Sequence, residues 1–245
     1  MTTNRGLDAI QREAWAFGRS LRNSLIADFE REYGQPAPPP ARIGGELLTD
    51  FLGARLSYDA LPLNIFAETT WHDGHPLVTV NSRTREIEGV KDPRGVSNVG
   101  VWHEVIHVQR DLSVVQLGPQ AALDGFLPNL TIACHRDRTR SARRDEEFRR
   151  EYFAEEAGRA AAVSFPHLIR SEAFRHFTYL AEQRLASEPP GWRALYTAAE
   201  DIGVNISALV KQLEVEGFLH VERSSGRSLL HPQPTLGNLL VRAGH

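Results

Sequence analysis

The sequence is poor in cysteine, with Cys134 as the single one among 245 residues. An intramolecular disulfide needs two cysteines and a cysteine-based zinc finger or ribbon needs several, so both are excluded. Any bound transition metal would have to be held mainly by histidines and carboxylates. Histidine, by contrast, is well represented, with 10 residues in the chain.

Long apolar runs and an excess of positive charge are also missing. No stretch of about 18 apolar residues occurs, so we expect no membrane span. Residues 1–21 carry charges throughout and lack the apolar segment of a signal peptide, and we therefore expect a cytoplasmic location. The 28 Lys and Arg against 31 Asp and Glu leave a formal net charge of -3. No global positive field therefore favours nucleic-acid binding.

The pattern of apolar residues and turn residues predicts an α+β fold. Residues 7–33 have the spacing of an amphipathic helix, and a proline-rich run at 36–40 ends it. Within 67–82, Asp73-Gly74 is typical of a hairpin turn. The other predicted elements are a helix at 45–52, a strand at 55–62, a helix starting at Ser97 with Ser97 or Asn98 as N-cap, a strand at 130–134 and a long helix at 138–165.

The last quarter of the chain has a pattern of its own. After the cluster Glu188-Pro189-Pro190-Gly191 come a helix, a turn at Gly203, a helix at 206–216 and two strands, which is a winged helix-turn-helix outline. We therefore expect two domains, 1–187 and 188–245. Between 192 and 231, four basic residues stand against five acidic ones, which favours packing against protein over reading DNA. Nucleic-acid binding stays an open but less favoured alternative.

The most informative motif is His103-Glu104-Val105-Ile106-His107, an HExxH pattern. On a helix, residues four apart share a face, so both imidazoles can reach one cation while Glu104 serves as general base. Zinc with three protein ligands keeps a position for water and lowers the pKa of that water. The apolar residues around the histidines predict a buried helix, whereas a chance match would be a His and Glu pair on the surface.

A third ligand is expected from the long downstream helix. Glu151 and Glu155 share a face with small residues that let this helix approach another closely. We favour Glu151 as the third ligand and Glu155 as an acceptor that orients a ligand histidine. Taken singly, Glu155 and Glu156 are more typical of solvated charges, and Cys134 is too isolated to compete. The remaining carboxylates considered for this role are Glu146 and Glu147.

HEVIH followed by the stretch from Glu151 to Gly158 resembles the motifs of gluzincin metallopeptidases. The order of N-terminal helix, strand, HExxH helix, glutamate helix and winged-helix-like segment is similar to ImmA/IrrE-type metallopeptidases. The resemblance implies a zincin-like domain and a zinc endopeptidase that cleaves a helix-turn-helix repressor, thereby releasing stress-response or mobile-element genes.

The predicted function is thus a zinc-dependent endopeptidase with His103, His107 and Glu151 as ligands and Glu104 as general base. Tyr152, His135, His167 or an arginine would donate a hydrogen bond to the substrate carbonyl, and the sequence does not choose among them. The expected partner is a protein substrate. Two alternatives remain at this point, a DNA-binding transcription regulator and a protein-binding factor whose zincin domain is not catalytic.

Overall fold

The computed structural model describes residues 4–43, 54–72, 75–115, 131–135, 146–224 and 227–236. The chain forms two compact units, Met1–Ala162 and Val163–His245, which are described separately below. Both combine helices with strands, so the predicted α+β class is confirmed. In the described part of the chain, no helix has the length and apolar character that crossing a membrane requires.

The first unit is built on a four-stranded sheet in the order β1-β3-β2-β4. β2 and β3 are antiparallel neighbours, β1 pairs parallel with β3, and β4 pairs antiparallel with β2. The predicted strands are thereby confirmed, while the Asp73-Gly74 turn and the predicted helix at 45–52 lie outside the described residues. The strands are β1 (Arg55–Asp59), β2 (Ile65–His72), β3 (His75–Asn81) and β4 (Thr131–His135).

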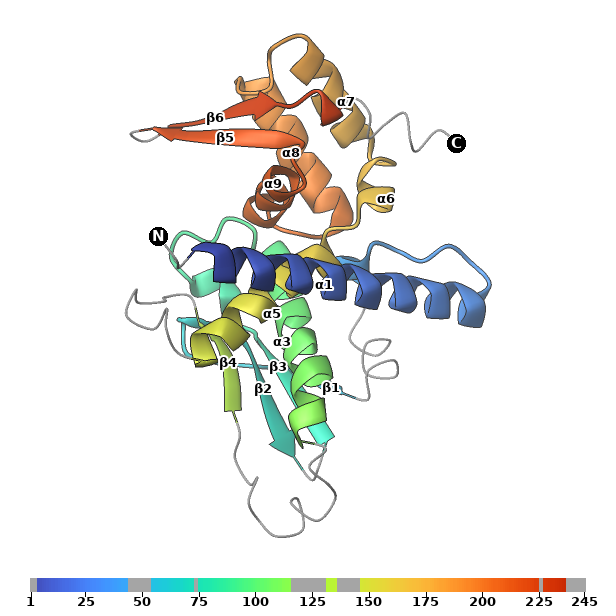
Figure 1. Cartoon of the computed structure of the whole chain (residues 1–245), viewed down its shortest axis with the longest axis vertical. Coiled ribbons are helices and arrows are strands. Elements are labelled where there is room, and N and C mark those ends of the chain that lie inside the picture. The colour runs from blue at the N-terminus through green and yellow to red at the C-terminus, as the bar shows by residue number, and fades with distance from the viewer. Residues whose placement is uncertain are drawn as a thin grey trace. The chain divides into compact units, whose positions relative to one another are not determined.

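Helix α3 (Pro93–Val115) carries the HExxH motif and packs on β2, β3 and β4 (Figure 1). The helix starts earlier than predicted, because Asp92 and Pro93 form its beginning. The Asp92 carboxylate accepts a hydrogen bond from the Gly95 backbone N–H at 2.9 Å, and Pro93 stands at the first helical position. Ser97 and Asn98 lie inside the helix, so the prediction that either caps it is wrong.

Helix α5 (Glu146–Ala162) contacts α3 and also the N-terminal helix α1 (Asn4–Tyr33), which confirms the helix predicted at 7–33. Both contacts are very close. A Cβ added at Gly18 of α1 would lie 2.1 Å from the carbonyl oxygen of Ala157. Ala14, Phe153, Ala154 and Ala157, with Ile106 of α3, form a buried cluster where the three helices meet. The small residues of α5 therefore let it fit between two helices.

The second unit contains the elements of the predicted C-terminal outline. Gly203 adopts a left-handed conformation with φ 78°, and Asn205 caps the next helix by accepting a hydrogen bond from the Ala208 N–H at 2.8 Å. The final two strands form an antiparallel ribbon. The elements are α6 (Phe165–Leu168), α7 (Glu172–Glu182), α8 (Pro189–Ile202), α9 (Ile206–Val215), β5 (Leu219–Ser224) and β6 (Arg227–Pro232).

The two units divide between Ala162 and Val163, whereas the sequence pattern predicts a boundary at 187/188. The difference arises because α7 packs on α8 and α6 also contacts α8, so these helices belong with the C-terminal elements. Pro189 and Pro190 form the first turn of α8 and do not form a linker. Ser187, just before them, hydrogen-bonds both backbone groups of Leu230 on β6.

Candidate metal centre

His103 and His107 stand one helical turn apart on α3, with their Nε2 atoms 3.1 Å from each other. Both rings are buried, with relative exposures of 3% and 2%. Apolar residues flank them on the same helix, Trp102 and Ile106 being almost completely buried. The predicted geometry of the HExxH motif is therefore present, with the two imidazole nitrogens converging on one point.

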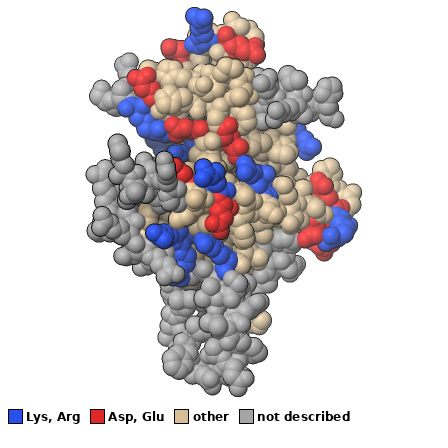
Figure 2. Space-filling model, in the orientation of Figure 1, with Lys and Arg blue, Asp and Glu red and all other residues tan. Residues whose placement is uncertain are grey.

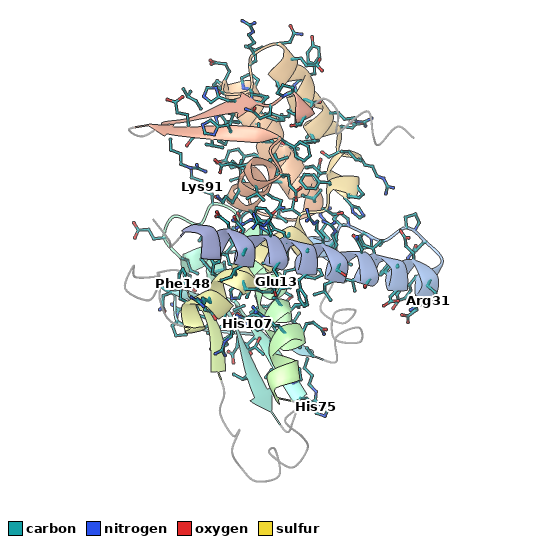
Figure 3. The ribbon with its side chains drawn as sticks, in the orientation of Figure 1. Glu13, Arg31, His75, Lys91, His107 and Phe148 are labelled. Carbon is teal, nitrogen blue, oxygen red and sulfur yellow. The ribbon has the colours of Figure 1, made fainter. Side chains whose placement is uncertain are left out.

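Glu151 of α5 reaches the same point from the neighbouring helix, where Figure 3 labels His107. Its Oε2 lies 3.4 Å from His103 Nε2, and its Oε1 lies 3.2 Å from His107 Nε2. The three side chains offer ligand atoms within 4.8 Å of one another and form a group that could hold a metal ion. The structure thus brings together the three residues expected as ligands.

The separations of these atoms fit a small tetrahedral cation. Ligand atoms about 2.0–2.1 Å from a tetrahedral zinc ion are about 3.3 Å from each other. The two histidine nitrogens are 3.1 Å apart, and a different Glu151 oxygen lies near each of them, Oε1 at 3.2 Å from His107 and Oε2 at 3.4 Å from His103. Each of these three pairs is therefore separated by about one edge of such a tetrahedron. Two imidazoles and one carboxylate also form a donor set used by catalytic zinc sites.

The electrostatics of Glu151 favour its charged form. Burial raises the pKa of the Glu151 carboxyl, but hydrogen bonds and charge interactions with the His103 and His107 rings outweigh burial and hold that pKa well below its ordinary value. A carboxylate that stays ionised at neutral pH is the form that binds a metal cation. The three side chains therefore offer two buried imidazole nitrogens and one carboxylate to a cation.

Glu104, the predicted general base, is completely buried beside His103. Its Oε2 accepts a hydrogen bond of 2.7 Å from the hydroxyl of Thr69 on β2. Sequence reasoning missed Thr69, since a threonine in a β-rich stretch is ordinary. Strand alternation gives one weak indication that Thr69 is buried, because residues two apart on a strand share a face and Ala67 is an apolar residue of the same strand.

Glu156 differs from expectation. It was expected as a solvated charge, but it is buried at 3% exposure and forms an ion pair with Arg159, which corrects that interpretation. Its Oε2 also accepts hydrogen bonds of 2.8 Å from the side chains of Gln11 and Trp15 on α1. Helix α5 thus carries one carboxylate toward α3 and another toward α1. Glu156 is buried because α1 packs against α5 on the side that faces away from α3.

The other candidate residues have different surroundings. Glu155 is exposed on α5, and its expected role beside a ligand histidine stays a prediction. Tyr152 is half-buried and stacks on Phe148, and burial followed by the charge of Glu156 raises the pKa of Tyr152 to about 12. His167 belongs to the second unit, where its Nδ1 pairs with Ser164 Oγ at 2.8 Å. The side chains of Cys134, His135, Glu146 and Glu147 lie outside the described part of the structure.

In comparisons with known proteins, no family model, no curated protein and no solved structure matches this chain. The interpretation of the centre therefore depends on its geometry. That geometry offers a three-donor cation site next to a buried carboxylate, a combination that suits hydrolysis of a polar substrate bond.

Proposed function

We propose that the protein is a zinc-dependent endopeptidase in which His103, His107 and Glu151 hold the metal and Glu104 acts as general base. The observation that carries the proposal is that the two histidine nitrogens lie 3.1 Å apart and that each has one oxygen of the Glu151 carboxylate 3.2–3.4 Å away, lengths close to the edge of a zinc tetrahedron. Glu104 adjoins this set on the same helix, where a base is needed.

The proposed chemistry divides between the ion and the chain. When bound, zinc supplies the positive charge that polarises the scissile carbonyl and makes water acidic enough to lose a proton near neutral pH. Glu104 takes that proton as the water oxygen forms its bond to the carbonyl carbon. It then delivers the proton to the departing amine as the carbon–nitrogen bond breaks. Burial of Glu104 and both histidines keeps these groups in fixed positions.

The family part of the proposal is supported by residues and by element order. HEVIH, the stretch from Glu151 to Gly158 and the succession of elements resemble ImmA/IrrE-type metallopeptidases, which implies a zincin-like fold for the first unit. We accordingly propose that the substrate is a protein, with a helix-turn-helix repressor as the specific expectation. The finer assignment of the second unit as a winged-helix module is part of the same proposal.

The experiment that tests the proposal loads the purified protein with zinc and incubates it with a peptide library made from a digest of cellular proteins. Mass spectrometry then identifies new termini. We expect cleavage by the wild-type protein that a chelator abolishes. Glu104→Gln is expected to retain about one zinc per chain and to lose cleavage, while His103→Ala loses the zinc as well. Wild-type protein that binds no zinc, or a Glu104→Gln variant that cleaves normally, would overturn the proposal.

A DNA-binding regulator is the second candidate, because α8, the turn at Gly203, α9 and the β5–β6 ribbon follow the winged-helix order. Charge argues against it. Lys211 and Arg223 both lie within ion-pair distance of Glu214, and on the face shown in Figure 2 basic and acidic residues are interspersed among the described residues. A gel-shift assay across salt concentrations decides, since specific and salt-sensitive binding would favour this candidate.

A further inference from the structure

Thr69 links the sheet to the base of the metal centre. It lies on β2 with 1% exposure, and its hydroxyl donates to Oε2 of Glu104 on α3, which is itself completely buried. The O···O separation of 2.7 Å is that of a well-formed O–H···O hydrogen bond. The contact joins residues 35 positions apart, so packing of α3 on the sheet creates it.

Another buried threonine of the same sheet behaves differently. Thr79 on β3 is 7% exposed, and its hydroxyl lies 3.0 Å from the hydroxyl of Ser57 on β1. That contact stays within the sheet and joins two neutral groups. The Thr69 hydroxyl instead donates a hydrogen bond to the carboxylate of Glu104 on helix α3, which packs on the sheet. The two residues therefore form a matched pair, one beside the centre and one that only joins strands.

We propose that Thr69 is the positioning residue of Glu104, holding Oε2 by its hydroxyl so that the carboxylate takes the proton of the attacking water, and delivers it to the departing amine, through Oε1. This inference depends on the proposed peptidase function. A glutamate side chain has several rotamers, and a fixed hydrogen bond to one oxygen restricts them and orients the other oxygen. The Thr69 hydroxyl hydrogen-bonds Glu104, whereas the group that could hold a metal ion is made of His103, His107 and Glu151.

A positioning role predicts a selective loss. Removing the hydroxyl leaves the metal ligands intact, so zinc content should stay at the wild-type level. Proton transfer takes place in the chemical step, so kcat should fall while KM changes little. Partners that orient groups at metal sites typically contribute about 10- to 100-fold to activity, and we expect a fall in kcat of that size.

The test compares Thr69→Val, which replaces the hydroxyl by a methyl group, with Thr69→Ser, which keeps it. Thr79→Val is the matched control in the same sheet. Each zinc-loaded variant is assayed on an internally quenched peptide built from a cleaved sequence of the library. We expect kcat to fall about 10- to 100-fold in Thr69→Val. Thr69→Ser should recover most of it and Thr79→Val should keep it. Thr69→Ala removes the same hydroxyl and takes the place of Thr69→Val if that variant does not fold.

A second readout needs no activity. In metal-free protein, urea midpoints of Thr69→Val, Glu104→Ala and the double variant form a thermodynamic cycle. We expect Thr69→Val to lower the midpoint when Glu104 is present and to change it much less in the Glu104→Ala background. Additive effects, or a Thr69→Val enzyme with wild-type kcat, would overturn the positioning role. Wild-type protein without zinc-dependent cleavage would instead overturn the peptidase proposal, while the cycle would still report the contact.

Discussion

Gly158 of α5 lies directly against the backbone of His103 on α3. A Cβ atom added at Gly158 would be 2.8 Å from the His103 nitrogen and 2.9 Å from its Cα, closer than real Cβ atoms come to main-chain atoms. Gly158 follows Glu151 by about two helical turns on the same helix. The close approach of the two helices therefore sets how far the Glu151 carboxylate lies from the two imidazoles.

Gly158→Ala should force the two helices apart. Because the obstacle is main chain and cannot rotate away, we expect a loss of about 1–3 kcal/mol in the free energy of unfolding, typical of overpacking. The same displacement should weaken zinc binding, since Glu151 moves with α5. Urea unfolding and a zinc titration with a competing chelator measure the two effects.

Gly100→Ala is the control for that substitution. A Cβ at Gly100, on the same helix as His103, would meet side-chain atoms of Ala67 and Phe66 at 3.6 Å, an ordinary contact. Alanine in a helix interior is favoured over glycine by about 1 kcal/mol, so this variant should be as stable as wild type or more stable. Equal zinc affinity in the two variants would show that the approach at Gly158 does not set the ligand geometry.

Zinc should stabilise the protein through Glu151. A ligand that binds only the folded state stabilises it by about 2.7 kcal/mol at a free concentration 100 times its Kd. We therefore expect zinc to raise the thermal midpoint of the wild-type protein and a chelator to reverse the rise. Glu151→Gln keeps the shape of the side chain but removes the anionic oxygen, and should lose most of this response. Arg149→Gln, at an exposed position of the same helix, should respond like wild type.

The part of the centre that the sequence predicted well depends on local geometry. Helical spacing alone places His103 and His107 on one face, and the 3.1 Å between their Nε2 atoms agrees with it. The small residues that share a face with Glu151 predict that this face packs closely on another helix. In the structure Ala154 and Gly158 do lie against α3. The spacing of residues along a helix is therefore sufficient to predict a contact when one face of the helix packs on one neighbouring helix.

Contacts between separate layers were not predictable in this way. Thr69 meets Glu104 only because the packing of α3 on β2 brings together residues far apart in the sequence. Glu156 is buried, against the prediction of a solvated charge, because α5 packs on α1 as well as on α3, and the pattern of a helix does not indicate how many neighbouring helices cover it. α3 begins early because Asp92 caps it and Pro93 follows at the first helical position. Ser97 and Asn98 are residue types that also favour an N-cap, so the sequence alone does not identify the right one.

The cap of α9 gives a prediction for the second unit. Asn205 accepts the Ala208 N–H through its side chain, so Asn205→Ala should destabilise the start of α9 by about 1 kcal/mol. Hydrogen exchange of the amides at 206–215, followed by mass spectrometry, should become faster. Ser207→Ala, an exposed position on the same helix, serves as control and should leave exchange nearly unchanged. Unaltered exchange in Asn205→Ala would mean that packing alone holds this end of the helix.

Glu156 should make stability depend on pH. Burial raises the pKa of the Glu156 carboxyl, but the charge and hydrogen bond of Arg159, with hydrogen bonds from Gln11 and Trp15, outweigh burial and lower that pKa below its ordinary value of 4.5. Between the lowered pKa of folded Glu156 and its ordinary value in the unfolded chain, the unfolded chain binds more protons than the folded one. The free energy of unfolding therefore rises with pH in this range. The contribution is complete above the unfolded pKa and is lost as pH falls through the folded pKa.

Glu156→Gln isolates that contribution. The variant leaves the Arg159 cation buried without its anionic partner, and breaking a buried pair costs about 3–5 kcal/mol, so we expect a loss of that order at pH 7. Because the variant has no carboxyl to titrate here, its free energy of unfolding should fall less steeply between pH 5 and pH 3 than that of wild type. Urea unfolding of metal-free protein at several pH values measures both quantities, with Glu155→Gln as the exposed control. Parallel pH profiles for wild type and Glu156→Gln would mean that folding does not lower the pKa of Glu156.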